Sequence, residues 1–250
     1  MNISEWNLWY RRIVRDFGFS NAEDRKAAIY LDSILRPYPK DELKKIIRGK
    51  TVFVVGAGPS VASSVPHLKK FRQATVICAD SAITILVKNK IIPHIIVTDL
   101  DGDLKILKKL GRTKTVFVVH AHGDNIGRLD MARNFANCIG TTQTKSIGKV
   151  YNFGGFTDGD RCVFLAEHFG ASRIVLLGMD FGKRIGMHSG TKKSERHTKI
   201  KKLKYAKMLL EWLSQQSDTE MYTLSRPING FKKINHEQLK QKLESELGSV

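Results

Sequence analysis

The stretch IIPHIIVTDLDGD (residues 91–103) joins an apolar run to three carboxylates, those of Asp99, Asp101 and Asp103. Its isoleucines and valine are typical of a strand buried on both faces, as in a parallel sheet covered by helices. Packing gives no reason for acids at the tip of such a strand, and carboxylates this close repel one another unless a positive charge neutralises them. The stretch therefore predicts a buried strand whose end binds a divalent cation.

Apolar runs of the same kind recur along the chain and alternate with segments of helical periodicity. Continuously apolar strands separated by helices predict an α/β fold, with a mostly parallel sheet and helices on both faces. The other predicted strands are TVFVV (51–55), ATVICA (74–79), KTVFVV (114–119), ANCIGTT (136–142), VYNF (150–153), RIVLLGM (173–179) and, as one more candidate, MYTLS (221–225). Helices are expected near residues 60–70, 81–89, 103–110, 124–135, 158–169, 197–216 and 235–247.

The start of the chain lacks a strand pattern and predicts an N-terminal helical segment, residues 1–48. Within it, NAEDRKAAIYLDSIL (21–35) offers Asn21 as the N-cap of a helix. Residues 49–182 are expected to form an α/β core. Residues 183–250, a lysine-rich segment followed by C-terminal helices, are expected to complete the same domain.

The composition is that of a globular protein, with 42% hydrophobic and 26% charged residues in a chain of 250. Cys78, Cys138 and Cys162 are widely spaced, which favours a reducing compartment over a disulfide scaffold or a zinc site. No apolar run approaches the roughly 18–20 residues of a membrane span, and the N-terminal residues do not resemble a signal peptide. We therefore expect a cytoplasmic protein without a membrane partner.

The formal net charge of +18 indicates either a polyanionic partner or a lysine-rich solvated surface. Both interpretations stay open because basic residues are spread along the chain. One segment is denser than the rest and is interpreted as a solvated helix face or as a lid that closes on phosphates. Its basic residues are Lys192, Lys193, Arg196, Lys199, Lys201, Lys202, Lys204 and Lys207.

Small, glycyl and acidic residues follow the predicted strands, at the carboxyl edge where such sheets bind ligands. GAGPS (56–60) follows the first strand and precedes a helix, so Gly56 and Gly58 would let the backbone approach a phosphate. Val61 stands where a dinucleotide-binding fingerprint has its third Gly or Ala. A tight strand-to-helix turn without a ligand is the alternative.

Asp99 and Asp101 are two residues apart, so in an extended strand tip both carboxylates point the same way. Paired carboxylates can bind Mg²⁺, which takes oxygen ligands and usually keeps waters and phosphates as the others. Asp80 follows another predicted strand and would complete the set, whereas Asp103 is expected to be an N-terminal helix residue. The alternatives are an acidic turn for the pair and a helix cap for Asp80.

HAHGDN (120–125) places His120 and His122 after the strand at 114–119. A zinc site would need a third nitrogen or sulfur ligand, which the spacing does not offer. Phosphate or nucleotide contact by the imidazoles, with Asp124 as a further metal ligand, is the interpretation that we favour. A strand-end histidine pair with Asp124 as a helix cap is the alternative.

GGFTDGDR (154–161) combines two glycines that permit a bend with two acids and an arginine. Thr157 or Asp158 could cap the helix that follows, which explains one acid but not both. A carboxylate here could accept two parallel hydrogen bonds from the amidine-like edge of a heterocycle. The string therefore predicts a substrate contact.

At this point PHIIVTDLDGD and NFGGFTDGDR together resemble the archaeal 6-hydroxymethyl-7,8-dihydropterin diphosphokinase (MptE-like) family, which is distantly similar to thiamine diphosphokinases. The resemblance rests on GAGPS, ADSA, TDLDG and GFTDGDR in this order, and it spans roughly residues 50–182. It implies transfer of diphosphate from ATP to the hydroxymethyl group of the pterin, with Mg²⁺ and release of AMP, in the synthesis of folate-type cofactors such as tetrahydromethanopterin.

The motifs and the resemblance together give the expected site residues. The catalytic carboxylates are Asp99 and Asp101, and the metal ligands are Asp80, Asp99, Asp101 and Asp124. ATP contacts are expected at Gly56, Gly58, Pro59, Ser60, Ser81, His120, His122, Asn125, Thr141, Thr142 and Gln143. Contacts with the acceptor are expected at Gly154, Gly155, Phe156, Thr157, Asp158, Asp160 and Arg161.

Phe156 and Gly159 stand where the thiamine enzymes have an arginine and a histidine, so we expect acceptor recognition to differ. A thiamine or other small-molecule diphosphokinase is the nearest alternative, followed by a metal-dependent glycosyltransferase. A nucleic-acid-binding module would fit the charge, but acids at the rim would repel a phosphate backbone. The expected partners are ATP and a pterin-like molecule, and a homo-oligomer stays open.

Overall fold

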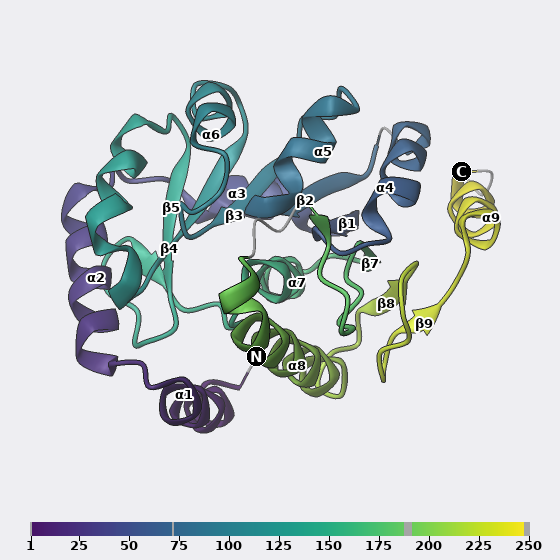
Figure 1. Cartoon of the computed structure of the whole chain (residues 1–250). Coiled ribbons are helices and arrows are strands. Elements are labelled where there is room, and N and C mark those ends of the chain that lie inside the picture. Colours follow the sequence, from purple (N-terminus) through teal and green to yellow (C-terminus); the bar gives the residue numbers. More distant parts are fainter. Residues whose placement is uncertain (1, 72, 188–191, 248–250) are drawn as a thin grey trace.

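The computed structural model describes residues 2–71, 73–187 and 192–247. A single twisted sheet runs through the molecule, with helices on both sides (Figure 1). Its strands lie in the order β6-β5-β4-β3-β2-β1-β7-β8-β9, and each neighbouring pair is parallel. The predicted fold class, a mostly parallel α/β sheet covered on both faces, is confirmed.

Each predicted apolar run contains a strand; the bounds of β1 are as predicted and those of the others differ. The run at 91–97 provides a strand only from Ile95, because Pro93 lacks an amide hydrogen and Ile92 is 62% exposed. The strands are β1 (Thr51–Val55), β2 (Thr75–Ala79), β3 (Ile95–Thr98), β4 (Val116–Ala121), β5 (Cys138–Thr142), β6 (Val150–Tyr151), β7 (Arg173–Leu177), β8 (Glu220–Thr223) and β9 (Lys232–Lys233).

The helices occupy the predicted intervals, but several are short or of the 3₁₀ type; the interval 124–135, for example, is a 3₁₀-helix. The α-helices are α1 (Ile3–Phe17), α2 (Asn21–Ile34), α3 (Lys40–Ile47), α4 (Val61–Ser64), α5 (Ile83–Lys88), α6 (Leu104–Leu110), α7 (Asp158–His168), α8 (Arg196–Ser214) and α9 (His236–Leu247). The 3₁₀-helices are η1 (Val65–Lys70), η2 (Asp80–Ala82), η3 (Gly123–Asn134) and η5 (Lys193–Glu195).

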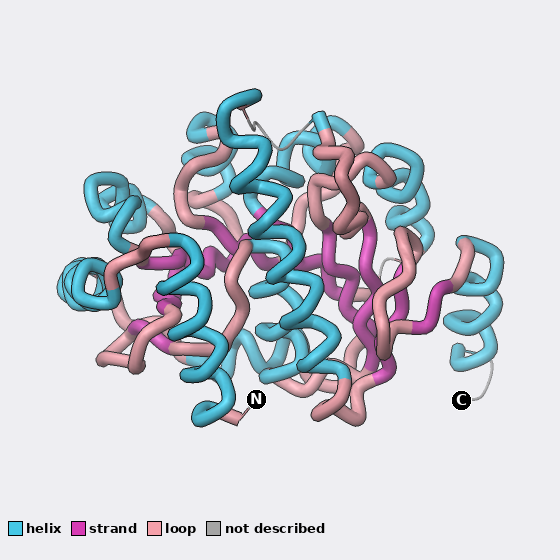
Figure 2. The backbone as a smooth tube through the Cα atoms, turned by 60° about the horizontal axis from the view of Figure 1, so that its bottom comes forward, coloured by secondary structure: helices cyan, strands magenta, loops and turns pink. Residues whose placement is uncertain are grey.

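Two hydrophobic cores fill the spaces above and below the sheet. Alternate residues of each strand point to opposite faces, so Phe53 and Val55 enter one core while Val52 and Val54 enter the other. The first core packs against α2, α4, α5 and α6, and the second packs against α1, α3, α7 and α8. Figure 2 shows helices on one side of the sheet lying across its strands. Burial on both faces explains why the strands lack a polar alternation.

The N-terminal segment is helical as predicted, and its helices cover both faces of the sheet. Side chains of α1 and α3 join the second core, whereas α2 packs against β5 and η3 on the other face. The predicted N-cap at Asn21 is wrong by one residue. Ser20 is the N-cap, and its side chain accepts a hydrogen bond from the Glu23 amide.

The order of the strands brings one set of loops together. From β1 the chain adds β2 to β6 successively on one side, and it then returns through α7 to place β7 on the other side of β1. The carboxyl ends of parallel strands lie at one edge, and the N-terminus of α7 reaches that same edge (Figure 1). In such sheets this edge is where ligands bind.

The state of the cysteines and the character of the helices bear on two predictions made from the sequence, that the chain has no disulfide scaffold and no membrane span. Cys78, Cys138 and Cys162 are free thiols buried in the cores. No helix in the described ranges combines the length and the apolar character needed to cross a membrane. The domain limits at residues 48 and 182 stay predictions.

Candidate functional site

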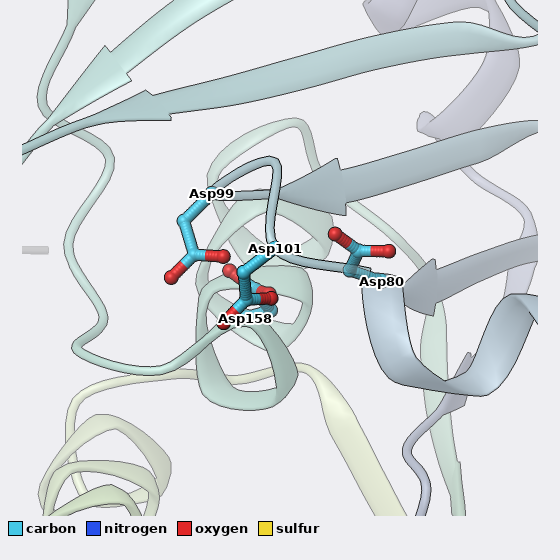
Figure 3. Close-up of side chains that lie close together, drawn as sticks. All are labelled: Asp80, Asp99, Asp101 and Asp158. Carbon is cyan, nitrogen blue, oxygen red and sulfur yellow. The ribbon is translucent and has the colours of Figure 1, made fainter. Parts of the chain in front are cut away.

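Four aspartates meet at the carboxyl edge of the sheet. Asp80 follows β2, Asp99 and Asp101 follow the neighbouring strand β3, and Asp158 is the first residue of α7 (Figure 3). One carboxylate oxygen from each lies within 4.8 Å of the others. The first three are the acids that the sequence predicted as metal ligands, and the structure places Asp158 beside them.

Asp80 is fixed by the loop that carries the other acids. Its Oδ2 accepts hydrogen bonds from the Thr98 hydroxyl (2.5 Å) and from the Gly102 amide (3.0 Å). A side chain at Gly102 would put its Cβ 1.8 Å from Asp80 Oδ1, so only glycine fits there. Oδ1 of Asp80 and Oδ1 of Asp99 are buried without a hydrogen-bond partner among the described residues. These two oxygens are available to a cation.

The pKa values reflect this crowding. Burial, together with the charge of Asp99, raises the pKa of Asp80 to about 6. Burial and the charges of Asp99 and Asp80 raise the pKa of Asp101 to about 7, although Lys199 acts in the opposite direction. Burial would also raise the pKa of Asp99, but the neighbouring His122 and Asp101 side chains and the charge of Arg161 lower it below its ordinary value. Burial and the three other acids raise the pKa of Asp158. A cation would relieve this repulsion.

The loop after β4 supports Asp99. His122 Nε2 lies 3.6 Å from Asp99 Oδ2, while His122 Nδ1 accepts a hydrogen bond from the Asp124 amide (3.3 Å). The side-chain amide of Asn125 donates to the carbonyl oxygens of Asp99 (2.9 Å) and His120 (2.7 Å). The loop after β4 is thereby tied to the loop after β3.

The predicted metal ligand Asp124 is not part of the cluster. The four clustered acids do not include it, and its side chain is 71% exposed. His122, rather than Asp124, caps η3. Asp103 lies at the N-terminus of a helix, as predicted: it is the N-cap of α6 and accepts hydrogen bonds from the Lys105 and Ile106 amides.

The string GGFTDGDR forms a bend that leads into α7. Gly154 and Gly155 have φ values of 88° and 86°, a region that side chains disfavour. A Cβ on Gly155 would lie 2.7 Å from Cα of Arg161. The two glycines are therefore required by the backbone, and their role is to pack the bend against α7.

The N-terminus of α7 is closed by a capping box between Thr157 and Asp160. The buried Asp160 carboxylate accepts hydrogen bonds from the amides of Phe156 (2.6 Å) and Thr157 (2.7 Å). The cap accounts for Asp160. It leaves Asp158 and Arg161, which are three residues apart in the first turn of the helix, and both line the cavity described next.

A cavity of about 640 Å³ opens beside the acidic cluster. Asp80, Asp99, Asp101 and Asp158 line one part of it, and Lys199 and Lys202 of α8 line another. Phe19 and Phe156, whose ring centroids are 6.2 Å apart, add an apolar surface. Its volume is within the usual range of small-molecule sites.

A smaller cavity of about 100 Å³ shares Asp158 with the large one. Gly56, Gly58 and Pro59 line it, and Asp158 and Lys199 line both cavities. The amides of Gly56 and Gly58 already donate to the carbonyl oxygens of Leu177 and Gly178 (2.8 Å each). These two amides are therefore not free to bind a ligand, and the two glycines contribute to the cavity by leaving space beside the backbone.

Asp180, which follows β7, holds the end of this loop. Both the amide (2.9 Å) and the hydroxyl (3.0 Å) of Ser60 donate to its carboxylate. A Cβ on Gly58 would lie 2.3 Å from the same carboxylate. Gly58 is thus needed for the contact between the loops that follow β1 and β7.

The structure divides the residues predicted as contacts into three groups. The large cavity is lined by Asp80, Ser81, Asp99, Asp101, His120, His122, Gln143, Phe156, Thr157, Asp158 and Arg161. The smaller cavity is lined by Gly56, Gly58 and Pro59, together with Ser81, Thr157 and Asp158. Neither cavity is lined by Ser60, Asp124, Asn125, Thr141, Thr142, Gly154, Gly155 or Asp160. Ligand contacts by all these residues stay predictions.

Sequence reasoning missed Asp24, which lines the large cavity and is 3% exposed. It also named no role for Phe19. A signal for Asp24 was present, because it lies three, four and seven residues before Ala27, Ala28 and Leu31 on the buried face of α2. An acid on such an apolar face needs a buried partner.

Fold and site together define the class: a parallel α/β protein whose carboxyl edge carries a four-aspartate cluster beside a small-molecule cavity. The chain belongs to the 6-hydroxymethylpterin diphosphokinase MptE-like family, whose sequence model matches residues 26–186. The resemblance found in the motifs is thereby confirmed.

Curated relatives match nearly their whole length. The 6-hydroxymethyl-7,8-dihydropterin pyrophosphokinase of Pyrococcus furiosus is 44% identical over 236 residues, which cover 90% of this chain and 100% of the relative. The protein of the same name from Methanocaldococcus jannaschii is 42% identical and covers 88% of this chain and 99% of its own. Among solved structures, the MAf glycosyltransferase from Magnetospirillum magneticum AMB-1 superposes with a TM-score of 0.61 at 13% identity, over 92% of this chain and 42% of that one. At this identity the likeness shows the fold alone.

Proposed function

We propose that the protein transfers diphosphate from ATP to the hydroxymethyl group of 6-hydroxymethyl-7,8-dihydropterin, with Mg²⁺ and release of AMP. The name shared by its curated relatives supports the reaction and the acceptor. The structural observation that carries the proposal is the cluster of four aspartates at the wall of a cavity of about 640 Å³. The reaction would serve the synthesis of pterin-type cofactors, and the free thiols of the three cysteines support the cytoplasmic location expected from the sequence.

The residues at the cluster fit a magnesium ion. Hard oxygen ligands are what Mg²⁺ prefers, and Oδ1 of Asp80 and Oδ1 of Asp99 are buried without other partners among the described residues. Burial and the charges of the other acids raise the pKa values of Asp101 and Asp158, and a bound cation would offset that repulsion. Bound there, Mg²⁺ would neutralise charge on the phosphate oxygens of ATP.

Lysines of α8 are proposed to contact the triphosphate. Lys199 and Lys202 are three residues apart and both line the large cavity. Lys199 also lines the smaller cavity next to Gly56 and Gly58. ATP is therefore proposed to lie across the boundary between the two cavities, where Ser81 and Asp158 line both.

The reaction requires mainly that the two substrates are oriented and that the charge on the phosphates is neutralised. The acceptor oxygen attacks the β-phosphorus, the bond from that phosphorus to the α–β bridging oxygen breaks, and AMP leaves with that oxygen. The hydroxyl proton is lost to a carboxylate or to water. Transfer of this kind needs orientation and positive charge more than a covalent intermediate. The lysines, and a Mg²⁺ ion bound by the acidic cluster, would supply the positive charge and orient the phosphates.

Phosphorus NMR tests the proposal directly. The protein is incubated with ATP, Mg²⁺ and 6-hydroxymethyl-7,8-dihydropterin, and a parallel sample contains thiamine instead. We expect AMP and a pterin diphosphate in the first sample only, and no reaction after EDTA is added. AMP formed only in the sample with thiamine would show that thiamine, and not the pterin, is the acceptor. Formation of ADP and inorganic phosphate would show hydrolysis of ATP and overturn the proposal of diphosphate transfer.

A further inference from the structure

The inner end of the large cavity is lined by polar side chains that are almost completely buried. Asp24, His120, Gln143 and Arg161 are 3%, 2%, 3% and 5% exposed. Within the described ranges, Gln143 Oε1 and the Nε and Nη1 atoms of Arg161 have no hydrogen-bond partner, and the ring nitrogens of His120 make no well-formed hydrogen bond. A buried polar group left in this state destabilises the folded protein, because it has lost its hydrogen bonds to water. Gathered at the wall of a cavity, these atoms require hydrogen-bond partners from water or from a bound ligand.

Asp24 fixes which way the amide of Gln143 points. Its Oδ2 accepts hydrogen bonds from the Tyr10 hydroxyl (2.7 Å) and from Gln143 Nε2 (2.8 Å), and its Oδ1 accepts from the Gly123 amide (2.9 Å). An ionised carboxylate only accepts, so the NH₂ group of Gln143 has to face Asp24. The carbonyl oxygen Oε1 is then the atom left without a partner, and it requires a donor from a ligand.

Arg161 offers the opposite chemistry. Its Nη2 donates to the carbonyl oxygen of Phe156 (2.7 Å), while Nε and Nη1 keep their hydrogens free. A ligand that satisfies this end of the cavity must therefore present donors near acceptors. The 2-amino-4-oxopyrimidine ring of a pterin has that pattern, with an amino group and a ring N–H as donors and a carbonyl oxygen and ring nitrogens as acceptors. Guanine carries the same pyrimidine edge, in which two neighbouring donors and one carbonyl acceptor lie side by side, so the pattern itself and not a particular ring system is what Gln143 and Arg161 would recognise.

The walls and the opposite end of the cavity suit the rest of such a molecule. Phe19 and Phe156 supply an apolar surface for a flat ring. The same cavity ends at Asp99 and Asp101, where a hydroxymethyl group would meet the phosphates. The stacked rings of His120 and His122, 5.6 Å apart, join the two ends.

We infer that Gln143 and Arg161 bind the pyrimidine edge of the acceptor heterocycle, and that Asp24 is the positioning residue that turns the Gln143 oxygen toward it. This inference rests on the proposed function and deepens it. The sequence predicted that Gln143 and His120 contact ATP, whereas this inference assigns them to the acceptor. It also gives α2, outside the predicted α/β core, a part in acceptor recognition.

Two dissociation constants test the inference in the full chain with Mg²⁺. One is for 6-hydroxymethylpterin, followed by its fluorescence, and the other is for α,β-methylene-ATP. Gln143→Met removes the acceptor atom and keeps the size of the side chain. We expect it to weaken pterin binding about tenfold or more, as for one buried hydrogen bond, and to leave the ATP analogue within twofold. Gln215→Met, the same change at an exposed residue of the α8 C-terminus, is the matched control and should alter neither constant.

Asp24→Asn tests the positioning role and also serves if Gln143→Met does not fold. An asparagine cannot accept from Tyr10, Gly123 and Gln143 at once, so the Gln143 amide loses its fixed orientation. We expect a selective loss of pterin affinity, which a merely structural change would not confine to one ligand.

The outcomes separate the two proposals. Unchanged pterin binding in the variants, a loss confined to the ATP analogue, or equal loss of both ligands would overturn this inference. A wild-type chain that binds the ATP analogue but not the pterin would instead overturn the proposed function.

Discussion

Asp158 reaches the acidic cluster from a helix, whereas Asp80, Asp99 and Asp101 reach it from loops that follow strands. Strand order alone could therefore predict three of the four acids. The capping box of α7 sets where Asp158 lies, since it fixes the first turn of the helix against the bend at residues 154–156. The fourth aspartate thus depends on a local backbone signal as well as on the sheet.

Asp158 and Asp124 form a matched pair for mutation, because the sequence favoured Asp124 as a ligand and the structure favours Asp158. We expect Asp158→Asn to lower diphosphate transfer on the order of 100-fold or more and to raise the Mg²⁺ concentration needed for half-maximal rate. Asp124→Asn, at an exposed side chain outside the cluster, should change the rate by no more than about twofold. Rates measured against Mg²⁺ concentration check both expectations, and the reverse ranking would restore the sequence-based ligand set.

At the scale of elements, α8 carries lysines on two different faces. Lys199 and Lys202 line the large cavity, whereas Lys204 is exposed and does not line it. At 100° per residue, Lys204 is turned well away from Lys199. The dense lysine segment of the sequence is therefore in part a cavity wall and in part a solvated surface.

Lys199→Ala is expected to raise the KM for ATP about tenfold or more, since a charge-assisted contact with phosphate contributes roughly 1.5–3 kcal/mol. The KM for the pterin should change little. Lys204→Ala removes the same charge from the same helix without touching the cavity, and it should leave both constants near those of the wild type. Equal effects of the two substitutions would mean that long-range charge, and not contact, explains the role of the lysines.

The sequence predicted most strands and helices because burial on both faces leaves an unbroken apolar run, as in TVFVV at β1. It missed β9, whose two lysines form a strand only through pairing with Tyr222 and Thr223 of β8. It grouped Asp80 with Asp99 because parallel strands end at one edge. It could not place Asp24 beside Gln143, since that contact joins residues 119 positions apart.

At the scale of the whole molecule, two apolar cores hold a sheet whose carboxyl edge brings four acids together. Thr98 and Gly102 donate hydrogen bonds to one of these acids, Asp80. A carboxyl group whose pKa is higher in the folded than in the unfolded protein binds protons more tightly when folded. Such a group lowers the free energy of unfolding as pH rises from its unfolded to its folded pKa.

This sign fixes how the metal-free protein should respond to pH. The pKa of Asp80 is raised to about 6 and that of Asp101 to about 7, against about 4 in an unfolded chain. The metal-free protein should therefore lose stability between pH 4 and pH 7. Asp80, which is 2% exposed, would account for about 3 kcal/mol of that loss. Asp99, whose pKa is lowered, has the opposite effect only below about pH 4.

Magnesium should restore the stability that the metal-free protein loses as pH rises, because the cation binds the ionised carboxylates of the folded state alone. We expect the melting temperature in EDTA to fall by about 5–10 °C between pH 5 and pH 8, and 10 mM Mg²⁺ to raise it more at pH 8 than at pH 5. Asp101→Asn removes one of the acids and should flatten both responses. Scanning calorimetry at the two pH values, with and without Mg²⁺, measures them. A metal-free protein that melts higher at pH 8 than at pH 5 would show that the four carboxylates do not repel one another in the folded state.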